Sequence, residues 1–177
     1  MSSRFLVIST SLNKDSRSKI MANRALERLQ EKEDSKWLDL QEIELPLCDG
    51  GTAYEHANVS KVSKLIKDAD GIIVSIPIYN FASGAAAKNL IELTGRAWTE
   101  KTVGFLCAAG GKSSYMSVMS LANSLMLDFR SIIVPSFVYA DKPCFEGNKI
   151  VDREIEERID KLADQVARIA KSLRTLA

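Results

Sequence analysis

Short apolar runs alternate with segments of helical periodicity along most of this chain. Five runs are too short for helices but apolar enough for buried strands, at residues 4–9, 36–40, 71–77, 101–109 and 131–139. Apolar residues three and four positions apart predict helices at residues 16–33, 58–69, 85–95, 114–129 and 152–175. The run at 71–77 is β-branched and apolar on both faces, which is typical of a central parallel strand covered by helices.

Strands that alternate with helices in this way predict a parallel sheet between two layers of helices. Five strands and five helices match the flavodoxin-like fold, a three-layer α/β/α sandwich with a five-stranded parallel sheet of order 2-1-3-4-5. The 177 residues fit one domain, and no internal repeat, low-complexity tract or linker divides them. We therefore expect a single domain over residues 1–177.

The composition argues against several classes of protein. Lys and Arg total 24 while Asp and Glu total 23, so there is no strong field for a polyanion, and we expect no nucleic-acid partner. Three cysteines without a Cys-x-x-Cys spacing disfavour a disulfide scaffold and a zinc site, and we expect no metal. We find no long apolar stretch and no signal-peptide pattern, so we expect no membrane partner and a cytoplasmic location.

In a sheet of this order, ligands bind beyond the carboxyl ends of the strands, where the strand order reverses. That rule points to the loops after the first, third and fourth strands, at residues 9–18, 77–84 and 108–114. The first loop is rich in hydroxyl groups and leads into a predicted helix that Ser16 or Ser18 can cap. Hydroxyls, free backbone N–H groups and a helix dipole predict a phosphate site, although a serine-rich loop can also serve only to cap a helix.

The other two loops offer a surface for a flat ligand. Tyr79 and Phe81 follow the central strand, with Asn80 between them, and their rings are either a stacking platform or ordinary aromatic residues at the edge of the core. In the third loop, Gly110 and Gly111 allow close approach of a ligand, or they simply turn the chain from strand to helix. Neither a GxGxxG pattern nor the full Walker A spacing is present, so we exclude a Rossmann dinucleotide site and an ATPase.

Together the loops resemble those of the NADPH-dependent FMN reductase family, which includes quinone, azo-dye and chromate reductases, and the resemblance covers nearly the whole chain. The family motif GSLRxxSxN is similar to Thr10, Ser11, Leu12 and Asn13, followed by Ser16 and Ser18. The family motif PxYNxSxPxxLKN is matched by Pro77, Tyr79, Asn80, Lys88 and Asn89. The Gly-Gly pair after the fourth strand is the third shared feature.

Several departures from these motifs bear on the site. Asn13 replaces an arginine, so a cation is missing from the first loop. Ser18 replaces an asparagine, which exchanges one polar residue at a helix start for another. In the second motif Ala82 replaces a serine and Gly84 a proline, so we expect a more flexible loop. One hydroxyl contact to the flavin is then either lost or supplied by Ser83, one place along.

The resemblance implies FMN as cofactor, NADPH or NADH as co-substrate, and a small-molecule acceptor such as a flavin, quinone, azo compound or metal oxyanion. It implies cofactor contacts at Ser9, Ser11, Asn13, Ser16, Arg17, Ser18, Pro77, Ile78, Tyr79, Asn80, Phe81, Ala109, Gly110, Gly111 and Lys112. FMN itself carries hydride transfer, so we expect no side-chain acid or base. Backbone N–H groups near Asn80 and at residues 109–111 are expected to stabilise the charge on the reduced ring.

Two functions of another class remain open, an electron carrier and a flavin-free interaction scaffold. A flavodoxin-like carrier is usually acidic around its flavin, whereas Lys14, Arg17 and Lys112 lie near the predicted site. A hydrolase is disfavoured, because the only histidine, His56, is predicted in a solvated loop and Cys107 within a core strand.

A homodimer or homotetramer is also expected. The helix at residues 85–93 and the loop that contains Trp98 are predicted to expose apolar surface on which subunits can pair. Members of the resembled family are commonly dimers with the flavin near the interface.

Overall fold

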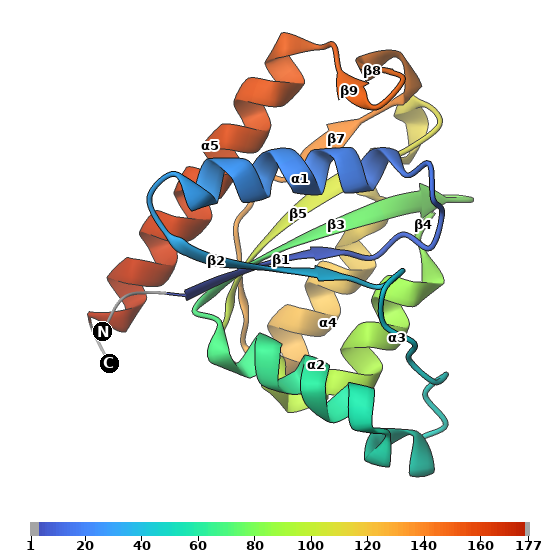
Figure 1. Ribbon diagram of the computed structural model, residues 1–177, viewed down its shortest axis with the longest axis vertical. Coiled ribbons are helices and arrows are strands. Elements are labelled where there is room, and N and C mark those ends of the chain that lie inside the picture. The colour runs from blue at the N-terminus through green and yellow to red at the C-terminus, as the bar shows by residue number, and fades with distance from the viewer. Residues whose placement is uncertain (1–3, 176–177) are drawn as a thin grey trace.

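The computed structural model describes residues 4–175. Its longest strands form one sheet, in which each pairs in parallel with its neighbours (Figure 1). The sheet follows the order β2-β1-β3-β5-β6, and β7 also pairs with β5. These strands are β1 (Arg4–Ser9), β2 (Asp34–Asp39), β3 (Gly71–Tyr79), β5 (Thr102–Ala108), β6 (Ile132–Ile133) and β7 (Val138–Ala140). The predicted flavodoxin-like order is therefore confirmed, with β6 and β7 together in the place of the fifth strand.

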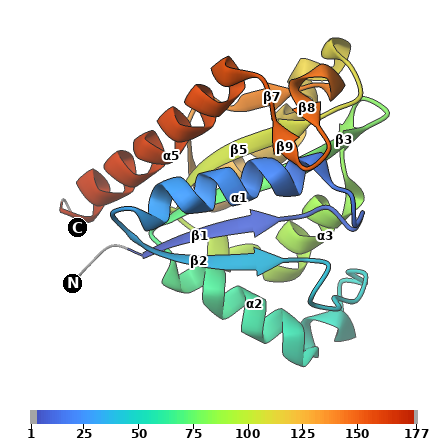
Figure 2. The same ribbon diagram turned by 45° about the horizontal axis from the view of Figure 1, so that its top comes forward.

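Helices cover both faces of the sheet (Figures 1 and 2). Helices α1 (Arg17–Gln30) and α5 (Arg153–Arg174) pack on one face, and α2 (Ala57–Asp68), α3 (Ala85–Thr94) and α4 (Met119–Phe129) pack on the other. Alternate residues of β1 serve the two layers: Phe5 and Val7 are buried with residues of α1 and α5, whereas Leu6 and Ile8 are buried with residues of α2, α3 and α4. Because both faces are covered, the central strands need apolar residues at nearly every position.

Small elements complete the fold. Strand β4 (Ala82–Ser83) pairs antiparallel with the end of β3, and β8 (Phe145–Glu146) pairs with β9 (Lys149–Ile150) in a separate hairpin. The 3₁₀ helices among residues 4–175 are η1 (Thr52–Glu55), η2 (Gly95–Trp98), η3 (Lys112–Val118) and η4 (Lys142–Cys144). Within the described chain, we find no helix both long enough and apolar enough to cross a membrane.

The prediction of a single last strand at residues 131–139 is wrong. The pairing with β5 continues as far as Val134, whose N–H donates to the Val103 carbonyl over 2.8 Å. Pro135 follows and has no N–H group, so the ladder stops there and resumes only at β7.

Two further predictions about this half of the chain are corrected. The helix predicted at 114–129 starts only at Met119, because η3 precedes it and Ser114 has the non-helical dihedral angles φ −99° and ψ 28°. The expectation that Trp98 lies at an exposed surface is wrong: its side chain is fully buried, and its indole N–H donates to Thr94 Oγ1 over 2.7 Å. Subunit pairing therefore cannot use this residue.

Candidate functional site

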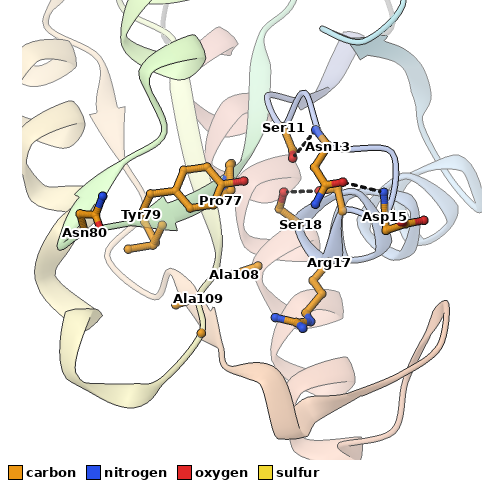
Figure 3. A pocket seen from close by; sticks show the side chains of 13 residues that line it. Ser11, Asn13, Asp15, Arg17, Ser18, Pro77, Tyr79, Asn80, Ala108 and Ala109 are labelled. Atoms are coloured by element: carbon orange, nitrogen blue, oxygen red, sulfur yellow. Dashed lines mark hydrogen bonds between the residues drawn. The ribbon is translucent and has the colours of Figure 1, made fainter.

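A cavity of about 560 Å³ opens at the carboxyl ends of β1, β3 and β5 (Figure 3). All three loops singled out in the sequence contribute to its wall, so a cavity opens at the edge of the sheet to which the strand-order rule pointed. The lining residues are Ser11, Asn13, Asp15, Ser16, Arg17, Ser18, Pro77, Ile78, Tyr79, Asn80, Ala108, Ala109 and Gly110. Its volume lies in the range of about 300–1,000 Å³ that is typical of small-molecule sites.

One end of the cavity is polar and lies at the start of α1. Ser16 is the N-cap of this helix, and its Oγ accepts a hydrogen bond from the Lys19 N–H over 3.2 Å. The Ser16 and Ser18 hydroxyls lie 2.9 Å apart, and both line the cavity. The first turn of α1 holds no acidic residue, so the positive end of its dipole is not neutralised from within the helix. This end is therefore suited to an anion.

The backbone of the first loop is held by a residue from outside it. The Gln41 side-chain amide donates to the carbonyl oxygens of Ser11, over 3.2 Å, and Asn13, over 2.7 Å. Deeper in the sheet, the Ser75 hydroxyl donates to the Ser18 carbonyl over 2.6 Å. These bonds fix the loop before any ligand arrives.

Two charged residues of opposite sign line the polar end. Arg17 makes no ion pair among residues 4–175, so its guanidinium is available to a ligand. Asp15 is exposed, and its N–H donates to Asn13 Oδ1 over 3.1 Å. Asp15 was not among the predicted contact residues, although its place between Asn13 and Ser16 was a usable signal.

The opposite end of the cavity is apolar and is formed by the turn between β3 and β4. Pro77, Ile78 and the Tyr79 ring line it, and Figure 3 shows the ring extending toward the first loop. Asn80 and Phe81 form the two-residue turn, with φ of 50° and 61°. Left-handed backbone is rare for a residue such as phenylalanine, so the turn is strained.

Gly84, which replaces a proline of the resembled motif, ties this turn to β3. Its N–H donates to the Pro77 carbonyl over 2.9 Å, which a proline cannot do. The neighbouring Ser83 hydroxyl is directed away from the cavity and donates to the Ser117 carbonyl over 3.3 Å.

The third loop meets the cavity through Ala108, Ala109 and Gly110. The expectation that the Ala109 N–H is free to stabilise a ligand is wrong, because it donates to the Ala140 carbonyl over 2.9 Å. A Cβ atom added to Gly110 or Gly111 would meet no protein atom within 4 Å. The space above these glycines is therefore open to a ligand.

Eleven of the fifteen predicted contact residues line the cavity and four do not. Ser9 lies fully buried beneath the site, and its hydroxyl has no hydrogen-bond partner among the described residues. Phe81 extends into solvent, while Gly111 and Lys112 lie just beyond the cavity wall. Ala108 also lines the cavity, although it was not among the predicted contact residues.

The residues expected to be uninvolved lie elsewhere. His56 is exposed and caps α2, where its Nδ1 accepts from the Asn58 N–H over 3.2 Å. Cys107 is fully buried in β5, and burial raises the pKa of its thiol to about 12. Neither residue lines the cavity, so neither can act there as a nucleophile or a base.

Comparison with known proteins gives a consistent picture. The model of the NADPH-dependent FMN reductase family matches residues 3–143. The NAD(P)H-dependent FAD/FMN reductase of Geobacillus thermodenitrificans (strain NG80-2) is 30% identical over 145 residues, which cover 80% of this chain and 78% of the relative. The NADPH azoreductase of Bacillus sp. (strain OY1-2) is 25% identical over 171 residues, 96% of this chain and 91% of the relative.

Solved structures agree in fold. The flavoenzyme NAD(P)H:(acceptor) oxidoreductase of Paracoccus denitrificans superposes with a TM-score of 0.78 over 96% of this chain and 98% of its own, at 16% identity. At 16% identity, this similarity supports the fold and not the activity.

Proposed function

This chain belongs to the NADPH-dependent FMN reductase family, and from that premise we propose that its cavity binds FMN and passes electrons from NADPH or NADH to a small acceptor. Family membership makes the protein a flavin-dependent NAD(P)H oxidoreductase. The placement of the cofactor and the class of acceptor are the parts that we propose. One observation carries the placement: a single cavity joins a polar, anion-favouring end to an apolar, open end.

The residues present fit FMN, which has a phosphate at one end and a flat ring at the other. The polar end offers the hydroxyls of Ser11, Ser16 and Ser18, together with N–H groups at the start of α1 that have no partner within the helix. The apolar end offers Tyr79 as a ring surface and an unobstructed approach over Gly110. A ligand with an anionic group at one end and a flat ring at the other can bind to the polar and the apolar end of the cavity at the same time.

We assign the phosphate to the first loop. A phosphate dianion needs several short donors, and the serine hydroxyls with the helix N-terminus supply them, while Arg17 adds one cation. Asn13 contributes no charge where the family has arginine, and Asp15 opposes the anion. We therefore expect FMN to be held more by hydrogen bonds than by charge.

We assign the ring to the second and third loops. When bound, FMN supplies the hydride chemistry, and the protein orients it. Tyr79 and Pro77 limit the space available to the ring, and the N–H groups of Asn80 and Gly110, which have no hydrogen-bond partner in the described chain, are two of the available donors. No side-chain acid or base is needed for this role.

The acceptor reaches the site through the mouth of the cavity, which we define as the exposed edge formed by Tyr79 and Phe81. Tyr79 is 53% exposed and Phe81 is 69% exposed, so both rings meet solvent beside the cavity. Such a mouth favours flat acceptors such as free flavins, quinones and azo compounds over metal oxyanions, which gain little from stacking.

We also propose a homodimer or homotetramer, with the subunits in contact beside the cavity. Exposed apolar side chains gather there, including Leu12 (66% exposed) and Leu47 (82% exposed), around a groove of about 330 Å³. Contact with a second subunit would remove this apolar surface from water. A light-scattering mass of a single chain for the active protein would contradict the assignment.

The visible spectrum of the purified protein tests the proposed function. We expect a yellow protein, or one that becomes yellow with added FMN, that bleaches when NADPH or NADH is added without air. Bleaching by dithionite alone would instead favour an electron carrier. A protein that stays colourless in excess FMN would favour an interaction scaffold and overturn the proposal.

A further inference from the structure

The third loop is anchored from within the fold by Tyr139, a residue that no motif singled out. Tyr139 lies in β7, beside Cys107 of β5, and is only 9% exposed. Its hydroxyl donates a short hydrogen bond to the Gly111 carbonyl oxygen and lies 2.8 Å from Ser114 Oγ. A carbonyl can only accept, so the single Tyr139 proton is committed to Gly111 and Ser114 must donate to Tyr139.

This bond is the main restraint on the turn at Gly110 and Gly111. Neither glycine has a side chain to pack, and their N–H groups make no hydrogen bond within residues 4–175. The preceding restraint is the bond from the Ala109 N–H to Ala140. Between Ala109 and the start of η3, the backbone orientation therefore depends on Tyr139.

The Tyr139 ring is itself held in place. Tyr115 meets it edge-on with ring centroids 5.6 Å apart, and Tyr115 in turn packs on Phe137 at 4.9 Å. These contacts fix the ring, so the hydroxyl stays beneath Gly111.

We propose that Tyr139 is a positioning residue for the flavin ring, acting through the peptide between Gly111 and Lys112. In a trans peptide the C=O and N–H point in opposite directions, so a carbonyl held toward Tyr139 directs the Lys112 N–H away from the core, toward the open side of the loop. The hydrogen bond also polarises this peptide and makes its N–H a stronger donor. The inference rests on the proposed function, because the donor matters only if the ring lies beside this loop.

Replacing Tyr139 by Phe tests the inference, since it removes one oxygen and keeps the ring. We expect the Kd for FMN, measured by fluorescence titration of the apoprotein, to rise about tenfold. We also expect the midpoint potential of bound FMN to become more negative, because a donor that favours the reduced, charged ring is loosened. A purely structural role would not move that potential.

Tyr115→Phe is the matched control, because the Tyr115 hydroxyl makes no hydrogen bond among the described residues. It should leave Kd and potential as in the wild type. Ser114→Ala, at a half-buried position, removes the hydroxyl that donates to Tyr139. It should shift the Kd and the potential in the same directions as Tyr139→Phe, but by less. It also keeps the test valid if Tyr139→Phe fails to fold.

The outcomes distinguish a failure of FMN binding from a failure of the role of Tyr139. A wild-type protein that does not bind FMN contradicts the proposed function. A wild type that binds FMN, with Tyr139→Phe and Ser114→Ala both within twofold of its Kd and unchanged in potential, overturns the role of Tyr139 alone.

Discussion

The first loop and the β3–β4 turn lie on opposite sides of one cavity, but they are held in different ways. The first loop is fixed by hydrogen bonds: Gln41 donates to two of its carbonyl oxygens, and Ser16 Oγ accepts from the Lys19 N–H in the first turn of α1. The β3–β4 turn carries Asn80 and Phe81 in left-handed backbone and exposes aromatic rings to solvent. One side is pre-organised and relaxed, and the other is strained and open.

This difference divides the work of the site. A permanent cofactor benefits from donors that need no rearrangement, because less conformational entropy of the loop is lost when the cofactor binds. Acceptors that come and go benefit from an accessible surface, and strain of about 1–3 kcal/mol is tolerated where it serves a site. The predictions below test each side separately.

The largest effect is expected on the pre-organised side, for the double variant Ser11→Ala with Ser16→Ala. Loss of these hydroxyls should weaken FMN binding by about 1–3 kcal/mol per lost donor. Fluorescence titration measures the affinity, and Ser60→Ala on the exposed face of α2 is the control. Because Ser16 also caps α1, thermal unfolding must show that the variant is still folded, at a cost of about 1 kcal/mol. Unchanged FMN affinity in the double variant would refute the phosphate assignment.

Gln41→Ala should have the next largest effect. It contributes nothing to the cavity wall, but it releases the carbonyls of Ser11 and Asn13 and thus loosens the loop. We expect FMN to bind about fivefold more weakly, the equivalent of about 1 kcal/mol. Gln30→Ala, at an exposed position of α1, serves as control. Equal affinities for the two variants would show that the loop needs no clamp.

On the strained side, Phe81→Gly should make the protein more stable. Glycine accepts left-handed backbone, and Asn-Gly is a preferred pair for this turn, so the free energy of unfolding should rise by about 1 kcal/mol in urea denaturation. The KM for a flat acceptor should rise as well, because the exposed ring is lost. Asn80→Gly is the comparison, with a smaller gain, since asparagine already tolerates this conformation. A less stable Phe81→Gly variant would show that the turn stores no strain.

The smallest effect is expected for Asp15→Asn, which removes a negative charge from the polar end of the cavity. FMN affinity should increase by about two- to threefold at low salt, and the gain should shrink as salt screens the charge. Asp128→Asn, exposed on α4, should change nothing. If Asp15→Asn weakens binding instead, the carboxylate supports the loop rather than opposing the phosphate.

The two sides also differ in how far the sequence predicted them. The capping of α1 by Ser16 was predicted correctly because capping is a local property of the chain. The third loop was predicted less well, because the Ala109 N–H is used by Ala140, thirty-one residues later in the chain, and Gly111 is held by Tyr139. Such contacts depend on which strands pair, and local composition does not encode that pairing.

The errors in the fold have a similar origin. Pro135 was a readable signal that the last strand is interrupted, since proline cannot continue a ladder. The burial of Trp98 had no such signal, because it results from the packing of η2 between α2, α3 and α4. A bulky residue in a loop is exposed or covered according to neighbours that only the complete fold supplies.

Periodicity and polar spacing were enough to place most of the alternating strands and helices. Matching that alternation to a known fold class then gave the order of the sheet and the loops that meet at its edge. These features follow from rules that act over a few residues or from general chain topology. Tertiary structure alone decided which donors are already used, which backbone is strained and which distant tyrosine anchors the glycine turn. Hydrogen bonds and burial are satisfied across the whole molecule, so they exist only once the strands have paired and the helices have packed.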